Sequence, residues 1–148
     1  MNKETELIIR PYEGVGPVKL GMTREEVRKA VGSRVETFYK TTDSTLPTDA
    51  FDSIGMHVYY KTPDSCNYIE FGRPAVPTFQ NTTLLGRPYK DVRDFFLAVD
   101  PKVEFHGDGT GFFSRRFGIG IFAPCADDAP KDPVEGVSVF EPGYYDCD

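Results

Sequence analysis

Apolar residues recur with helical spacing in two short stretches of the chain. In the first, Thr23 and Glu26 have the spacing of a capping box, an apolar stripe follows, and Gly32 can end the helix. In the second, apolar residues recur every three or four positions between Pro88, which suits a first helical turn, and Asp100, which precedes another proline. Both predicted helices are short, so each must pack against other elements to be stable.

Alternation of inward and outward positions predicts β-strands after each helix. Residues 56–60 place His57 and Tyr59 on one side of a strand, with the other three side chains on the opposite side. A turn at residues 62–65 returns the chain along residues 67–71, which completes an antiparallel hairpin. The strands predicted after the second helix span residues 103–105, 112–113, 117–123 and 137–140.

The two halves of the chain contain similar segments in the same order. Residues 20–28 resemble residues 85–93 at an offset of 65 positions, and residues 54–59 resemble residues 117–122 at an offset of 63. Matches that keep their order and nearly keep their spacing are typical of an internal duplication. The predicted repeating unit is a short helix followed by a β-meander.

These patterns predict an α+β fold in a single domain over residues 1–148. The domain would consist of two tandem helix-plus-β-meander repeats, at about residues 7–72 and 73–145. A meander covered by one short helix leaves an unpaired strand edge. Joining two such units edge to edge gives one antiparallel sheet of about six to eight strands. The short helices would cover one face and leave the other open to water or to a partner.

Composition agrees with a small globular protein and adds an asymmetry of charge. The 148 residues are 39% hydrophobic and 27% charged, with a net charge of −6. Basic and acidic residues balance over residues 1–116, whereas residues 117–148 contain seven acidic residues and one basic residue. Such a segment repels phosphates and attracts cations, so we expect a basic protein partner and no nucleic acid. It can also be a solvated surface that keeps the protein soluble.

The start of the chain and its cysteines indicate a cytoplasmic protein. No secretory-signal pattern begins the sequence, and no stretch approaches the roughly 20 apolar residues of a membrane span. We therefore expect no membrane association. Cys66, Cys125 and Cys147 are widely spaced and lack a CxxC pair, which favours free thiols over a disulfide framework or a zinc site.

No catalytic motif is present in the sequence. His57 and His106 are the two histidines, and they lack the spacing of a metal site. There is no G-x-S-x-G nucleophile elbow, and each cysteine lies near carboxylates, which weaken a thiol as a nucleophile. We therefore predict no catalytic residues, no bound metal and no cofactor, and we expect that the protein is not an enzyme.

Aromatic residues occur as adjacent pairs at positions 59–60, 112–113 and 144–145. Neighbours in a strand face opposite sides, so each pair predicts one ring in the core and one on the open face, where such rings anchor protein interfaces. Alternatively, these rings fill a core that lacks tryptophan or are covered by loops such as residues 41–50. The residues predicted to bind a partner are Tyr59, Asp127, Asp128, Glu141, Tyr144, Tyr145 and Asp146.

The segment Leu20–Val27, with Gly32 after it, resembles the opening of β-lactamase-inhibitor-like proteins and of the SmpA/OmlA outer-membrane lipoproteins. The resemblance implies helices ahead of an antiparallel meander and, in the inhibitor, a tandem repeat of the unit size inferred here. Unlike the lipoproteins, the sequence has no cysteine near its start. As a small acidic protein, the chain is also similar in kind to the immunity proteins that bacteria pair with secreted toxins.

We therefore expect a bacterial, non-catalytic protein-binding or inhibitor module, of the immunity type, that binds a basic toxin or enzyme. A different possibility is a small-molecule-binding or enzymatic domain with a pocket between the two repeats. A structural subunit of a larger assembly is a third. The pocket of the second possibility would be lined by His57, Tyr59, His106 and Arg115.

Overall fold

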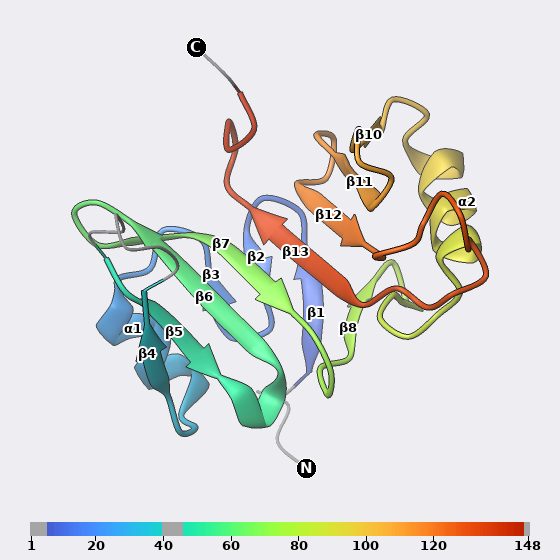
Figure 1. Ribbon diagram of the computed structural model, residues 1–148. Coiled ribbons are helices and arrows are strands. Elements are labelled where there is room, and N and C mark those ends of the chain that lie inside the picture. Colours follow the sequence, from blue (N-terminus) through green and yellow to red (C-terminus); the bar gives the residue numbers. More distant parts are fainter. Residues whose placement is uncertain (1–5, 40–45, 147–148) are drawn as a thin grey trace.

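The computed structural model describes residues 6–39 and 46–146, which form two α-helices, a short 3-10 helix (η2, Asp52–Ile54) and two β-sheets (Figure 1). The larger sheet has eight strands, and every neighbouring pair in it is antiparallel. In order across the sheet, the strands are β10 (Glu104–Phe105), β11 (Gly111–Ser114), β12 (Ile119–Phe122), β13 (Gly136–Phe140), β7 (Ser65–Phe71), β6 (Met56–Lys61), β5 (Thr48–Phe51) and β4 (Glu36–Phe38).

The smaller sheet has five short strands. Its neighbours are antiparallel except at the centre, where β1 and β8 run parallel. In order, the strands are β3 (Val18–Lys19), β2 (Gly14–Val15), β1 (Leu7–Arg10), β8 (Pro77–Phe79) and β9 (Thr82–Thr83). This sheet therefore joins the beginning of the chain to the segment that follows β7.

Both predicted helices are present and end close to the predicted residues. The first, α1, spans Arg24–Val31; its Thr23 forms the capping box with Glu26, and Gly32 ends it in the left-handed conformation at φ 68°. The second, α2, spans Tyr89–Val99 and lies between Pro88 and Asp100. Each helix is followed along the chain by four consecutive strands of the larger sheet, β4–β7 after α1 and β10–β13 after α2.

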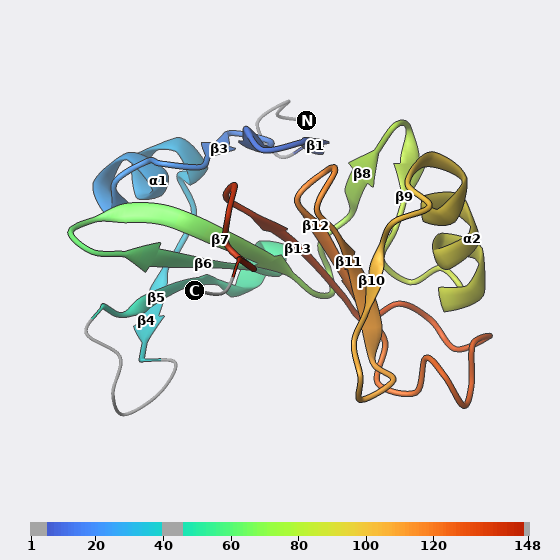
Figure 2. The ribbon, with the colours of Figure 1, turned by 90° about the horizontal axis from the view of Figure 1, so that it is seen from above.

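A single hydrophobic core lies between the larger sheet and a layer that contains both helices and the smaller sheet (Figure 2). It includes Val27 of α1, Phe96 of α2, and the inward residues Ile69 of β7 and Val139 of β13. On β6, Met56 and Val58 also point into this core, while His57 and Tyr59 point away, as the alternation predicted. Both helices thus cover the same face of the larger sheet.

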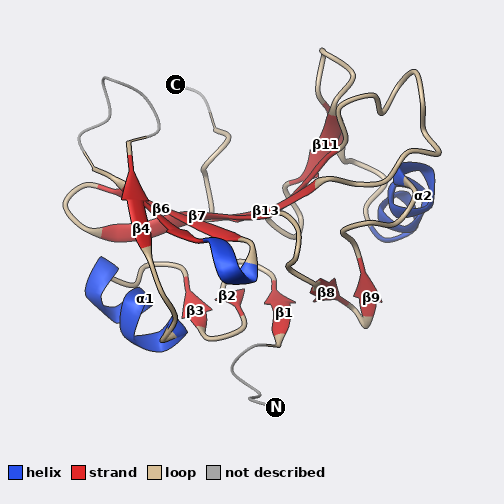
Figure 3. Cartoon of the chain, turned by 60° about the horizontal axis from the view of Figure 1, so that its bottom comes forward, coloured by secondary structure: helices blue, strands red, loops and turns tan. Residues whose placement is uncertain are grey.

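Within the described residues, α1, α2 and the smaller sheet leave the opposite face of the larger sheet uncovered, and this face is concave. From above, β6 and β7 lie at a steep angle to β10–β12, with β13 between them (Figure 2). In Figure 3, α1 and the smaller sheet lie on the covered face of β6, β7 and β13, opposite to the concave face. We call this uncovered side the open face.

The α+β class is correct, but the prediction of one sheet is wrong. The strands of the smaller sheet have two to four residues, too few for alternation to be visible. The pairing of Leu7 with Pro77 also joins residues far apart in sequence. The tandem duplication remains a prediction. Within the described residues, neither helix is long and apolar enough to cross a membrane.

Candidate binding face

Polar and aromatic side chains form rows across the strands at the centre of the open face. Glu70 on β7 lies opposite His57 on β6 and opposite Ser138 on β13. The neighbouring row consists of Tyr59, Tyr68 and Phe140. The two strands that bring these rows together are β7 and β13, the last strands of the two four-strand groups.

The C-terminal segment, residues 141–146, covers one corner of the open face. Tyr145 stacks on Phe113 with ring centroids 4.1 Å apart and meets Phe140 edge-on at 4.9 Å. Tyr144 packs beside Phe140 at 5.9 Å. As a result, Phe113 and Phe140 are only 8% and 2% exposed, although α1 and α2 lie on the other face of the sheet.

Ion pairs fix the C-terminal segment at both of its ends. Arg115, in the turn after β11, pairs with Glu104 and, at 2.5 Å, with Asp146. Arg115 also donates to the backbone carbonyl of Tyr145, at 3.2 Å. At the other end, Lys61 pairs with Glu141 at 2.6 Å. The segment is therefore attached to both halves of the larger sheet.

A pocket of about 240 Å³ lies beside this segment, between β7 and the hairpin that joins β10 to β11. Its lining residues are Tyr68, Glu70, His106, Asp108, Thr110, Gly120, Ile121, Phe122, Gly136, Val137, Ser138 and Tyr145. Since β12 and β13 lie between these two boundaries in the strand order, they form the floor.

Two glycines leave room for this pocket. A Cβ atom on Gly120 would lie 2.4 Å from Ser138 Oγ, and a Cβ on Gly136 would lie 3.2 Å from the Cβ of Phe122. Because both positions have no side chain, the floor lies lower than the tyrosines beside it. The pocket therefore depends on glycine at two positions of adjacent strands, β12 and β13.

The pocket is acidic and rich in hydroxyl groups. Asp108 Oδ1 accepts hydrogen bonds from the Thr110 hydroxyl at 2.6 Å and the Thr110 amide at 3.2 Å, and the hydroxyl bond lowers the pKa of Asp108. Glu70 accepts from the Tyr59 hydroxyl at 3.0 Å. Burial raises the pKa of Tyr68, so its hydroxyl stays protonated. Among the described lining residues there is no lysine or arginine.

The structure brings only one of the four predicted pocket residues, His106, into this pocket. The Tyr59 hydroxyl donates a hydrogen bond to Glu70, which lines the pocket, but Tyr59 itself is not a lining residue. His57 is on the same face but lies beside Asp52, at 3.4 Å, and the ring of Phe38. Arg115 forms an ion pair with Asp146 of the C-terminal segment and lines a separate pocket, together with Glu104 and Arg116.

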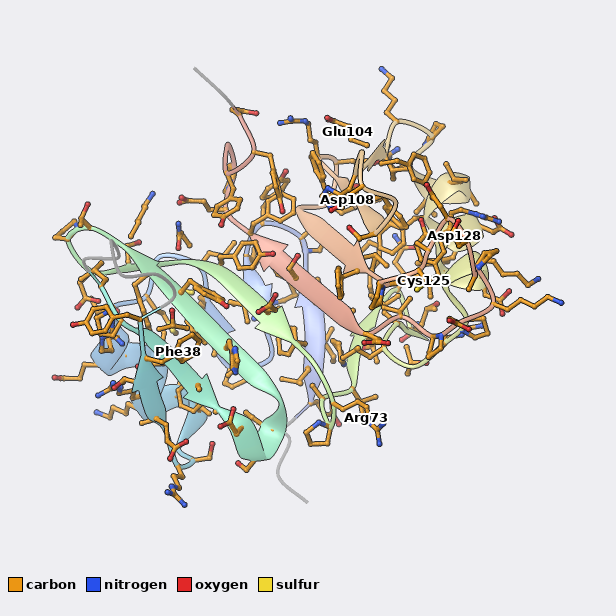
Figure 4. All side chains as sticks on the ribbon, viewed as in Figure 1. Phe38, Arg73, Glu104, Asp108, Cys125 and Asp128 are labelled. Carbon is orange, nitrogen blue, oxygen red and sulfur yellow. The ribbon has the colours of Figure 1, made fainter. Side chains whose placement is uncertain are left out.

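The residues predicted to bind a partner fall into two groups. Tyr59 and four residues of the C-terminal segment lie on the open face: Glu141, Tyr144, Tyr145 and Asp146. Asp127 and Asp128 lie in the loop between β12 and β13, which packs against the start of α2. Figure 4 shows Asp128 beside α2. Asp127 also lies beside the β10–β11 hairpin, where its amide donates to the Gly109 carbonyl at 3.3 Å.

The aromatic pairs follow the predicted alternation only inside strands. Tyr60 and Phe112 are in the core, and Tyr59 and Phe113 are on the open face. Tyr144 and Tyr145 lie in a turn, where neighbours need not face opposite sides, and both rings pack on Phe140.

Cys66 is buried with a free thiol, and Cys125 is free and exposed. Burial raises the pKa of Cys66 to about 12, so this thiol is a poor nucleophile. Cys147 lies outside the described residues. Within the described part of the chain, no three side chains of His, Cys, Asp or Glu are arranged to hold a metal ion.

The pocket residues that the sequence did not reveal include Tyr68, Glu70, Asp108, Gly120, Gly136 and Ser138. Two of them had a usable signal, because Tyr68 and Glu70 occupy alternate positions of a predicted strand. Gly120, Gly136 and Ser138 join the pocket through the pairing of β7, β13 and β12, and Asp108 joins it through the pairing of β11 with β12. The sequence offers no local signal for these pairings.

No protein-family model matches this sequence, and no curated protein matches it. Among solved structures, the chain is similar to the uncharacterized protein yfeY from Escherichia coli, with a TM-score of 0.56 and 12% sequence identity. The match covers 93% of this chain and 100% of that chain. At this level of identity, the similarity concerns the α+β fold alone.

Proposed function

We propose that this protein is a non-catalytic binding module of the cytoplasm that holds a basic protein against its open face. The observation that carries the proposal is the acidic pocket within a concave, aromatic surface. Glu70 and Asp108 border the pocket, and the described lining residues include no lysine or arginine. A cationic segment is the complementary partner, because opposite charges speed encounter and set orientation.

Exposed aromatic rings on the same face support a protein partner. Phe122, at the pocket, is 46% exposed, and Phe38, near His57, is 38% exposed. Aromatic residues that remain accessible in the free protein supply much of the contact energy at protein interfaces. The two rings lie on β12 and β4, so a partner that touches both would span most of the larger sheet.

We also propose that the protein is an immunity-type inhibitor, which blocks the basic toxin or enzyme that it binds. The proposal also includes an internal duplication, supported by the recurrence of a helix followed by four antiparallel strands that meet at β7 and β13. In that case the open face lies across both copies, and its centre is the junction between them.

Site-specific photo-crosslinking in the cells that make the protein tests this function. A photoreactive phenylalanine analogue replaces Phe122 on the open face or, as the matched control, Leu97, which is 37% exposed on α2. We expect a discrete adduct with a basic protein from position 122 and none from position 97. Equal adducts at both positions, or none at position 122, would contradict the proposal.

Inhibition is tested with the crosslinked protein once mass spectrometry has identified it. We expect that adding the wild-type protein lowers the toxicity or catalytic rate of the crosslinked partner. Unchanged activity of the partner at a saturating concentration of the wild-type protein would contradict the inhibitor part of the proposal.

A further inference from the structure

Building on the binding function proposed above, we propose that the pocket between Glu70 and Asp108 receives one arginine side chain of the partner protein. The partner's main chain would lie across the concave face, and its guanidinium group would descend to the floor made by Gly120 and Gly136. This assigns a specific chemical role to the pocket, beyond the general attraction of a basic protein.

The size of the pocket fits a single side chain. Pockets for drug-sized ligands have volumes of about 300–1,000 Å³, whereas this one measures about 240 Å³. A long unbranched side chain can enter such a depression while the rest of the ligand stays outside it. The size therefore favours one residue of a larger partner over a metabolite enclosed by the protein.

The two carboxylates are placed on opposite sides of the floor. Glu70 is on β7, Asp108 is in the β10–β11 hairpin, and β13 and β12 lie between them. Both hydrogen bonds from Thr110 go to Asp108 Oδ1, and the Tyr59 hydroxyl donates to Glu70 Oε1. The second oxygen of each carboxylate can therefore accept from the five N–H donors of a guanidinium group.

The aromatic walls favour arginine over lysine. Tyr68 and Tyr145 line the pocket beside the carboxylates. A planar guanidinium group stacks on aromatic rings and is weakly hydrated, while an ammonium group is compact and strongly hydrated. Ser138 adds a hydroxyl acceptor at the floor.

Amide chemical shifts of the full-length protein provide the test, with small blocked amino acids as probes. N-acetyl-arginine methylamide is titrated first, followed by the corresponding lysine and citrulline compounds. We expect saturable shifts at the amides of Gly120 and Gly136 with arginine, weaker binding of lysine, and no binding of the uncharged citrulline. Equal binding of citrulline, or shifts confined to other surfaces, would overturn the assignment.

Two conservative variants test the carboxylates. Glu70→Gln keeps the acceptor for Tyr59, and Asp108→Asn keeps the acceptor for Thr110, so both should preserve the fold and its amide spectrum. Loss of one charge-assisted hydrogen bond should weaken arginine binding by about tenfold or more. The control Asp94→Asn removes an equal charge from the exposed surface of α2 and should leave binding unchanged. If all three variants weaken binding equally, the effect is net charge and the pocket has no specific role.

The two proposals can fail separately. If position 122 crosslinks a basic protein while the arginine probe leaves Gly120 and Gly136 unshifted, the binding face stands and the arginine pocket is rejected. If the arginine probe binds but no partner is captured, the pocket stands as a guanidinium site and the protein-binding function is rejected.

Discussion

At the scale of single residues, Asp49 stands out because its carboxylate is wholly buried. It accepts hydrogen bonds from Arg24 at 2.6 Å, from Arg28 at 2.8 Å and 3.0 Å, and from the Tyr60 hydroxyl at 2.9 Å. Two of these donors belong to α1, and Asp49 belongs to β5. The network therefore ties the first helix to the larger sheet through charge as well as apolar contact.

The variant Asp49→Asn removes the charge while keeping the shape. We expect the free energy of unfolding to fall by about 2–3 kcal/mol, because several charge-assisted bonds in a buried site weaken together. Urea denaturation followed by circular dichroism measures this. The control Glu36→Gln breaks an exposed pair with Arg34 and should cost less than about 1 kcal/mol. A loss at Asp49 no larger than the control's would show that the network adds nothing to stability.

At the scale of elements, the C-terminal segment acts as a cover for two aromatic side chains of the sheet. Without it, Phe113 and Phe140 would face water on the open face. Its own aromatic residues lie in a turn and gain their positions from these contacts and from Arg115.

The variant Tyr145→Ala tests this cover. We expect a loss of about 2 kcal/mol in unfolding free energy, roughly half the cost of removing a fully buried aromatic ring, because Tyr145 is half-buried. Increased binding of a hydrophobic dye should accompany the loss as Phe113 becomes exposed. The control Tyr39→Ala, at a residue that is 59% exposed, should change neither quantity appreciably. Equal effects of the two variants would contradict a covering role.

The elements that sequence patterns could predict are those whose signals are local. Thr23 and Gly32 define α1 within ten residues of chain, and His57 and Tyr59 reveal the two faces of β6. The strand β8 and the pocket could not be predicted in the same way. They depend on pairings such as Leu7 with Pro77 and Glu70 with Ser138, which are set by packing of the whole chain.

At the scale of the whole molecule, tyrosine burial links stability to alkaline pH. Burial is the largest cause that raises the pKa of seven tyrosines, which are Tyr12, Tyr59, Tyr60, Tyr68, Tyr89, Tyr144 and Tyr145. In the unfolded chain each hydroxyl loses its proton near pH 10. A raised pKa in the folded state means that the native protein retains these protons longer than the unfolded chain does.

We therefore expect unfolding free energy to fall as pH rises above about 10, since the unfolded chain then releases protons that the folded chain keeps. Below that pH the stabilising contribution is fully present. Urea denaturation at a series of pH values, together with the ultraviolet absorbance of tyrosinate, measures both quantities. Ionisation of all the tyrosines near pH 10 in a protein that remains folded would contradict the expectation.

The central position of β13 has a consequence for how the protein is made. Its pairing joins Val137 to Phe71 and Phe140 to Tyr68, so the middle of the larger sheet needs a strand that is synthesised long after β7. Until then, the nascent chain presents one side of β7 with unsatisfied backbone groups, a template for association with other chains. Such distant pairing also slows folding. Chaperone dependence during synthesis, and aggregation of fragments that stop before Gly136, are the biological results to be expected from this arrangement.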